Sequence, residues 1–127
     1  MPGLDSIEGE GVDEDEMLVY VAGPYSKGKW GSNQRRAIRA AQNVLKMGHV
    51  PFLPHTMTGL WSVLYDNAWI KFDLKWLEQC DAILRLPGES EGADTEVEFA
   101  KARGIYVFGS IDELRTYSMK HDLGSYS

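Results

Sequence analysis

Short apolar runs alternate with amphipathic stretches from Met17 onward, and this alternation predicts the secondary structure. The short runs are rich in β-branched and aromatic residues, which is typical of buried strands. Four strands are expected at residues 18–22, 50–53, 81–86 and 105–108. The stretches between them carry apolar residues at every third or fourth position, which is typical of helices. Four helices are expected at residues 33–47, 66–79, 93–103 and 111–119.

Individual residues mark some ends of these elements. Asn33 is a suitable cap for the first helix, and Gly48 is a suitable stop. Pro51 lies inside the second apolar run, and a proline is tolerated in a sheet mainly on an edge strand because it has no N–H group. We therefore expect the second strand to lie at an edge.

The order of strand and helix, repeated four times, indicates the fold class. Such alternation favours an α/β fold with a parallel sheet and helices on both faces. Right-handed crossovers then favour a flavodoxin-like or Rossmann-like three-layer sandwich of four or five strands. We expect residues 17–127 to form one domain, preceded by a disordered acidic tail at residues 1–16. Ligands bind at the carboxyl ends of such strands, which selects the loops at residues 23–32, 54–61 and 87–92.

Composition and charge narrow the partners and the compartment. The net charge is -6, which argues against a nucleic acid polymer as a partner. Arg35, Arg36 and Arg39 form the densest basic group, and we interpret them as a solvated helix face. No run approaches the roughly 20 apolar residues of a membrane span, and the acidic N-terminus does not resemble a secretory signal. With Cys80 as the single cysteine, these features predict a soluble cytoplasmic protein with no membrane partner.

The histidines do not form a metal-binding pattern. His49, His55 and His121 have no spacing, among themselves or with Cys80, that fits a set of metal ligands. We expect neither a metal nor a cofactor.

Glu96 is the first candidate for chemistry. It is expected in the first turn of the third helix, directly after a glycine-rich loop, and it borders the apolar positions Phe99 and Ala100. One interpretation is a structural glutamate that balances the helix dipole. The other is a functional carboxylate at the mouth of the sheet. Glu98 lies on the opposite side of the helix and is expected to be solvated.

Asp73 and Tyr20 are the next candidates. Asp73 shares a helix face with apolar residues such as Ile70 and Leu77, and a carboxylate in an apolar stripe is unfavourable unless it is paired, hydrogen-bonded or functional. A capping or network role is the structural alternative. Tyr20 lies in the first strand, where a buried hydroxyl needs a hydrogen-bond partner.

Three loop residues could contribute to binding. Ser90 and Gly92 precede or open the third helix, where backbone N–H groups can hold an anion. Trp61 lies in a loop expected to face the ligand, although aromatic residues in this region are more often part of a core.

Five segments resemble the nucleoside 2-deoxyribosyltransferase family, in that family's order. Val19–Pro24 resembles the opening strand and loop. Asp73-Leu74 and then Cys80–Leu84 resemble the second helix and third strand. Ser90–Ala100 and then Gly104–Phe108 resemble the helix that carries the nucleophile and the fourth strand.

The resemblance, which covers about residues 17–110, implies an assembly and a mechanism. It implies a flavodoxin-like fold and a homo-oligomer whose sites are completed by a neighbouring subunit. It also implies a glutamate nucleophile at Glu96, a tyrosine at Tyr20 that hydrogen-bonds it, and an aspartate at Asp73 near the nucleobase. A carboxylate under C1' stabilises the developing positive charge and then bonds to it, while an acid protonates the leaving base. This is the two-carboxylate logic of retaining glycoside hydrolysis.

More than one reaction stays open. Ser90 occupies the position where transferases commonly carry an aspartate, six residues before the nucleophile. A serine there resembles the related deoxynucleoside 5'-monophosphate N-glycosidases, in which it helps to hold the phosphate. Glu98 occupies a position where many relatives have glycine. The alternatives are transfer of the sugar to another nucleobase, hydrolysis of a nucleoside monophosphate, and a non-catalytic nucleotide-binding module on the same fold.

The expected site has a catalytic and a substrate-binding set. The catalytic set is Glu96, Asp73 and Tyr20. The substrate-binding set is Gly23, Pro24, Tyr25, His55, Trp61, Ser90 and Gly92. The expected partners are a nucleoside or nucleoside monophosphate, a free nucleobase, and further copies of the chain in a homodimer or larger homo-oligomer. Aromatic residues at 61–76 or near Tyr126 are expected at that interface.

Overall fold

The computed structural model describes residues 16–24, 30–54 and 66–126, and the described elements follow the expected alternation. In chain order they are β1 (Leu18–Ala22), α2 (Trp30–Lys46), β2 (Val50–Phe52), α4 (Asp66–Leu77), β3 (Ala82–Arg85), α5 (Glu91–Ala102), β4 (Tyr106–Phe108) and α6 (Ile111–Tyr126). The expected acidic tail lies outside the described residues except for Glu16.

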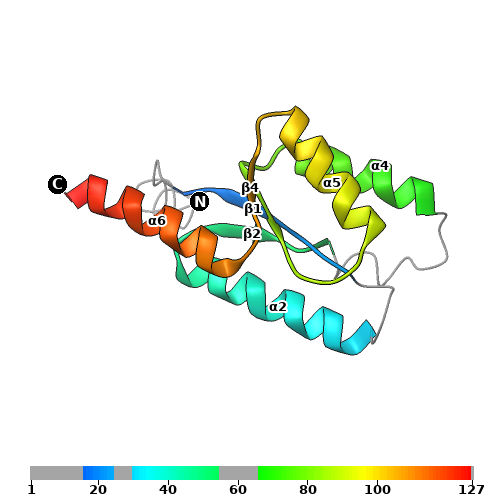
Figure 1. Cartoon of the computed structure of the whole chain (residues 1–127), viewed down its shortest axis with the longest axis horizontal. Helices are drawn as coiled ribbons and strands as arrows, with labels where there is room; N and C mark the ends of the chain where they lie inside the picture. The colour runs from blue at the N-terminus through cyan, green and yellow to red at the C-terminus, as the bar shows by residue number, and fades with distance from the viewer. Residues whose placement is uncertain (1–15, 25–29, 55–65, 127) are drawn as a thin grey trace, which may run out of the picture.

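The four strands form one parallel sheet in the order β2-β1-β3-β4. The helices α4 and α5 cover one face of this sheet, and α2 and α6 cover the other (Figure 1). This arrangement confirms the α/β class, and it is consistent with a flavodoxin-like or Rossmann-like sandwich. The strand that contains Pro51 lies at an edge, as predicted.

Successive residues of β1 point to opposite faces of the sheet and so supply two separate cores. Val19 and Val21 pack in the core beneath α2 and α6. Tyr20 and Ala22 pack in the core beneath α4 and α5. All four side chains are buried because β1 lies between two other strands and between two helical layers. The period of two in a strand therefore places the Tyr20 ring on the α4–α5 side.

Two helix starts differ from the sequence-based expectation. Asn33 does not cap α2, because the helix begins at Trp30 and Asn33 lies inside it. Ser32, another capping residue type, also lies inside the helix, so a capping residue type by itself does not locate the start of a helix. The helix α5 begins at Glu91, with Ser90 as its N-cap: the Ser90 hydroxyl oxygen accepts a hydrogen bond from the Ala93 N–H at 3.1 Å.

The remaining boundaries shift by one or two residues, with one exception. The helix α4 ends at Leu77 rather than at residue 79, and β3 and β4 are shorter than the apolar runs that contain them. The exception is α6, which continues to Tyr126, beyond the expected end at residue 119. None of the described helices is long and apolar enough to cross a membrane.

His49 joins the start of β1 to α6. Its Nδ1 accepts a hydrogen bond from the Met17 N–H at 3.1 Å, so Nε2 carries the ring proton of the neutral form and lies 2.8 Å from the Ser118 hydroxyl. The ring is buried, and the contacts of its two nitrogens with Met17 and Ser118 connect β1 to α6. Within the described part of the chain, no cluster of three or more His, Cys, Asp or Glu residues could hold a metal ion.

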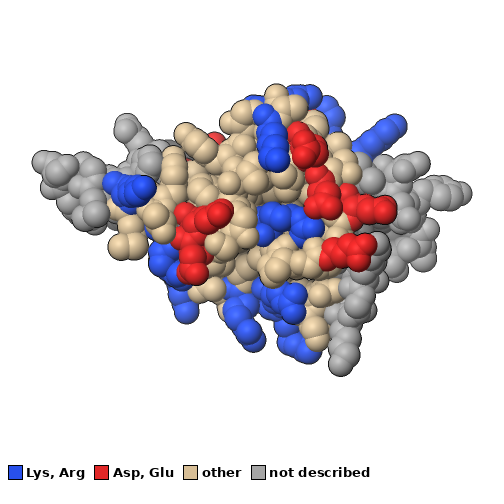
Figure 2. Space-filling view, in the orientation of Figure 1, with Lys and Arg blue, Asp and Glu red and all other residues tan. Residues whose placement is uncertain are grey.

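Basic side chains gather along the edge that α2 occupies (Figure 2). Arg35, Arg36 and Arg39 are exposed there, which agrees with their interpretation as a solvated helix face.

Candidate active site

Three side chains from three elements meet between the sheet and the α4–α5 layer. They are Tyr20 of β1, Asp73 of α4 and Glu96 of α5. The Tyr20 hydroxyl donates a hydrogen bond to Glu96 Oε2, and Asp73 lies close enough to shift the pKa of both groups. The two acids are each 8% exposed, and Tyr20 is fully buried. The expected convergence of these three residues is therefore present, and their catalytic roles stay a prediction.

Small residues on α5 explain how Glu96 reaches the sheet. Ala93 and Ala100 lie three residues before and four residues after Glu96, so all three share the buried face of the helix. Because alanine side chains are short, the helix can lie close to β3 and β4, and Glu96 can reach Tyr20 of β1. Asp73 is placed in the same way, four residues before Leu77, which is fully buried.

Glu96 is not in the first turn of its helix, so that expectation was wrong. With Ser90 as the N-cap, Glu96 is the sixth helical residue and lies in the second turn. The acids of the first turn are Glu91 and Asp94. The effect of the helix dipole falls off within the first turn, so balancing the dipole no longer explains the position of Glu96.

The buried acids have pKa values displaced upward. Burial is the main cause for Glu96 and raises its pKa from 4.5 to about 8; the nearby Asp73 adds to the rise, whereas the Tyr20 hydrogen bond and the Arg85 charge oppose it. Burial also raises the pKa of Asp73 from 3.8 to about 6, against the hydrogen-bonding influence of Glu96 and Tyr20. Burial, followed by the two negative charges, raises the pKa of Tyr20 so far that it stays a hydrogen-bond donor. Near pH 7 the two acids therefore hold one proton between them.

One oxygen of this cluster has no partner. Asp73 Oδ1 is buried and makes no hydrogen bond to any described residue. A buried acceptor without a donor is unfavourable by about 1–3 kcal/mol. A ligand with an N–H or O–H group at this position would satisfy it.

Two glycines allow the loops at the carboxyl ends of β1 and β3 to pack closely against each other. A Cβ added to Gly23 would lie 2.9 Å from Leu86 Cβ. Gly88 has a φ of +115°, and an added Cβ would lie 2.8 Å from Pro24 Cγ. Gly23 and Pro24, expected to bind substrate, thus also have a packing role against the loop before α5.

The other expected substrate-binding residues fall in two groups. Ser90 caps α5, and Gly92 lies in its first turn, where an added Cβ would meet nothing within 4 Å. Tyr25, His55 and Trp61 lie outside the described residues.

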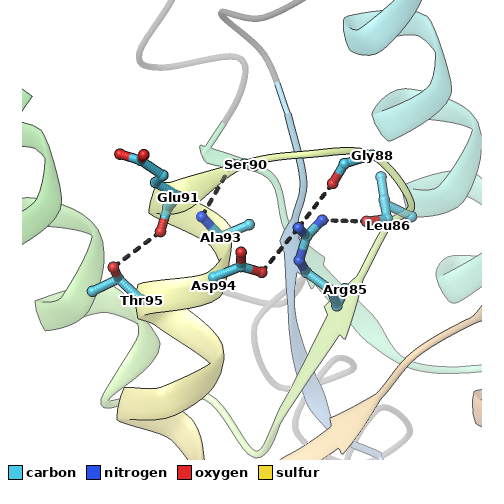
Figure 3. A network of polar contacts seen from close by, with 8 residues as sticks. All are labelled: Arg85, Leu86, Gly88, Ser90, Glu91, Ala93, Asp94 and Thr95. Carbon is cyan, nitrogen blue, oxygen red and sulfur yellow. Dashed lines mark hydrogen bonds and ion pairs between the residues drawn. The ribbon is translucent and has the colours of Figure 1, made fainter.

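Arg85 belongs to the site region and was not found by the sequence-based reasoning. It lies at the end of β3, and its guanidinium group donates hydrogen bonds to the carbonyl oxygens of Leu86 and Gly88 and to Asp94 (Figure 3). The sequence feature that could have identified it is its positive charge within the apolar run 82–86. Glu98, in contrast, is exposed and forms an ion pair with Lys101 at 3.7 Å, as its expected position required.

The raised acid pKa values predict how stability depends on pH. The folded protein binds protons at Asp73 and Glu96 more tightly than the unfolded chain does. The contribution of this pair to the free energy of unfolding should therefore fall as the pH rises from about 4 to about 8. Urea denaturation of the wild type and of the double variant Asp73→Asn/Glu96→Gln, at several pH values, measures this contribution as a difference. Parallel pH profiles for the two proteins would contradict the prediction.

Comparison with known proteins places the chain in a family. No curated protein matches the chain. The sequence model of a domain of unknown function, DUF7768, matches residues 17–109, which contain β1 to β4 together with Tyr20, Asp73 and Glu96. That description assigns no activity. Because the match covers most of its length, the chain belongs to the DUF7768 family.

Proposed function

We propose that the chain cleaves the N-glycosidic bond of a nucleoside or deoxynucleoside through a covalent glycosyl-Glu96 intermediate and transfers the sugar to another nucleobase. The observation that carries the proposal is the buried cluster of Tyr20, Asp73 and Glu96, in which two acids hold one proton near neutral pH. Clusters of acids with displaced pKa values are typical of functional sites. The resemblance of the surrounding segments to nucleoside 2-deoxyribosyltransferases adds support.

In the proposed first step, a Glu96 carboxylate oxygen bonds to C1' as the bond from C1' to the base nitrogen breaks. The base leaves with the electron pair of that bond and takes a proton from Asp73. In the second step, a nitrogen of the incoming base bonds to C1', the ester bond to Glu96 breaks, and the proton lost by the incoming base returns to Asp73. If water takes the place of the second base, the same sequence gives hydrolysis.

The proton that the two acids share has to be on Asp73 for this chemistry to begin. Burial raises the pKa of both acids, so the pair keeps a proton in the free protein. Positive charge developing at C1' would favour the ionised form of Glu96 and push the proton to Asp73. Tyr20 donates to Glu96 Oε2 and stabilises the carboxylate that results.

A nucleoside fits the described residues better than a nucleoside monophosphate does. Ser90, which would hold the phosphate in the hydrolase alternative, lies between the exposed acids Glu89 and Glu91. Acidic side chains gather over the beginning of α5 (Figure 2). A doubly charged phosphate would be repelled by them. We therefore propose the transferase reaction first and keep the monophosphate N-glycosidase as the alternative.

Assembly into a homo-oligomer belongs to the same proposal. Trp76 of α4 lies in the segment expected to face a neighbouring subunit, and it is 46% exposed while stacking on Phe52 at 5.2 Å. An exposed tryptophan of this kind is typical of interfaces.

One incubation distinguishes the three candidate functions. The protein is mixed with nucleosides, nucleoside monophosphates and free bases, and the products are separated by chromatography. Base exchange that requires an acceptor base supports the transferase, and base release from a monophosphate without an acceptor supports the hydrolase. In the second case Ser90→Ala should weaken turnover of the monophosphate and leave that of the nucleoside nearly unchanged. Binding of these compounds with no turnover would refute catalysis and leave a nucleotide-binding module.

A further inference from the structure

The Arg85 side chain, at the end of the central strand β3, forms hydrogen bonds with the β3–α5 loop and with α5. This side chain, 18% exposed, donates to the carbonyl oxygens of Leu86 and Gly88, the latter at 2.9 Å, and to Asp94 Oδ1 at 3.1 Å. One guanidinium group thus holds the strand, the β3–α5 loop and the first turn of α5 (Figure 3).

This contact set is more than a surface ion pair. The Asp94 side chain is 71% exposed, so solvent screens its charge and the ion pair alone contributes little. The two carbonyl contacts are the distinctive ones, because they fix the path of the loop backbone. A planar guanidinium group can donate in several directions at once, and a lysine cannot reproduce that pattern.

The loop that Arg85 fixes leads directly to the candidate nucleophile. Gly88, one of its acceptors, packs against Pro24 at the end of β1, and Asp94 precedes Glu96 by two residues on α5. The conformation of this loop therefore sets where α5 begins and how Glu96 meets the Tyr20 hydroxyl. The Arg85 charge also acts on Glu96 directly: burial raises the pKa of Glu96, and Arg85 opposes that rise.

We propose that Arg85 is a positioning residue of the site, which holds the β3–α5 loop and the start of α5 so that Glu96 faces Tyr20 and the sugar. This inference rests on the proposed function. Arg85 acts through the loop and through its charge, and it is not assigned any contact with the substrate.

The test compares three variants with wild type. Arg85→Met removes the charge and all three contacts, Arg85→Lys keeps only the charge, and Asp94→Asn removes the ion pair while leaving the carbonyl contacts. We expect Arg85→Met to lower kcat about 10- to 100-fold, the size of effect that misplacing a reacting group can produce. We expect Arg85→Lys to lower kcat as well, and Asp94→Asn to stay within about twofold of wild type.

The pH dependence separates positioning from general destabilisation. Three groups on elements packed against α5 act on the Glu96 carboxyl: Tyr20 of β1, Asp73 of α4 and Arg85 of β3. Only the Arg85 charge is lost in Arg85→Met, so the pKa of Glu96 should move upward in that variant and stay near the wild-type value in Arg85→Lys. Carbon NMR of labelled glutamate carboxyls measures this pKa without any substrate, and thermal unfolding shows whether each variant is folded.

The outcomes distinguish this inference from the proposed function. If Glu96→Ala is inactive while folded Arg85→Met keeps wild-type kcat and an unshifted Glu96 pKa, Arg85 has no positioning role and the proposed function stands. If Glu96→Ala keeps its activity, the proposed function and this inference both fail. If Arg85→Met does not fold, Arg85→Lys is the deciding variant. A wild-type kcat in Arg85→Lys would show that the hydrogen bonds of the guanidinium group are not required, and it would overturn the proposal.

Discussion

Replacing Glu96 with alanine is expected to abolish turnover while the protein stays folded. Loss of the nucleophile should lower the rate at least about 1000-fold, which corresponds to about 4 kcal/mol of activation free energy. The expected effect on stability is smaller. The Tyr20 hydroxyl loses its acceptor, which is unfavourable by about 1–3 kcal/mol, but a buried acid is also removed, and the two effects oppose each other.

Glu98→Ala is the matched control for this prediction. Glu98 lies on the same helix, but its side chain is 76% exposed and forms an ion pair with Lys101 at 3.7 Å. Turnover and melting temperature should therefore both stay close to wild type. Steady-state kinetics and thermal unfolding of the two variants provide the comparison. Wild-type turnover in Glu96→Ala, on whichever substrate proves active, would remove Glu96 from the mechanism.

Asp73→Asn is expected to have the second largest effect. Removing a general acid typically lowers the rate about 100- to 10,000-fold. The substitution also removes the negative charge of Asp73. In wild type this charge, together with burial, raises the pKa of Glu96. The pKa of Glu96 should therefore fall in Asp73→Asn. Any residual activity should begin to rise at a lower pH than in wild type, because the ionised form of Glu96 appears earlier.

The pH profile of kcat/KM tests both parts of this prediction. Asp112→Asn is the control, because Asp112 is an exposed acid on α6 that pairs with Arg115 at 2.8 Å, away from the α4–α5 layer. It should leave the rate and the profile unchanged. If Asp73→Asn retains the wild-type rate, another group protonates the leaving base. If its rate falls while the profile does not move, Asp73 does not set the pKa of Glu96.

The sequence predicted the sheet well because strand and helix periods are local properties. The bounds of β1 and the edge position of Pro51 followed from short patterns of residue types. The same periodicity placed Asp73 on the buried face of its helix. The meeting of Tyr20 with Glu96 was expected from the family resemblance, and the structure adds a physical reason in the short side chains of Ala93 and Ala100.

Features that depend on loop conformation were not predicted. Ser90 was placed in a loop, and its role as N-cap, which moves Glu96 into the second turn, depends on where the backbone enters the helix. The contacts of Arg85 with Leu86 and Gly88 depend on the path of that same loop. The close packing of Gly88 on Pro24 joins segments far apart in the chain, and no local pattern records it.

The central pairing of β1 with β3 makes the site depend on contacts between distant parts of the chain. Tyr20 and Glu96 are separated by 76 residues, and their contact requires β1, β3 and α5 to be in place together. Contacts between distant parts of a chain form slowly, because the intervening loop must lose entropy before the contact stabilises it. A partly folded chain that retained α2 or α6 alone would hold no residual site. Recovery of the Tyr20–Glu96 contact during refolding should thus follow the slowest step by which the whole sheet forms.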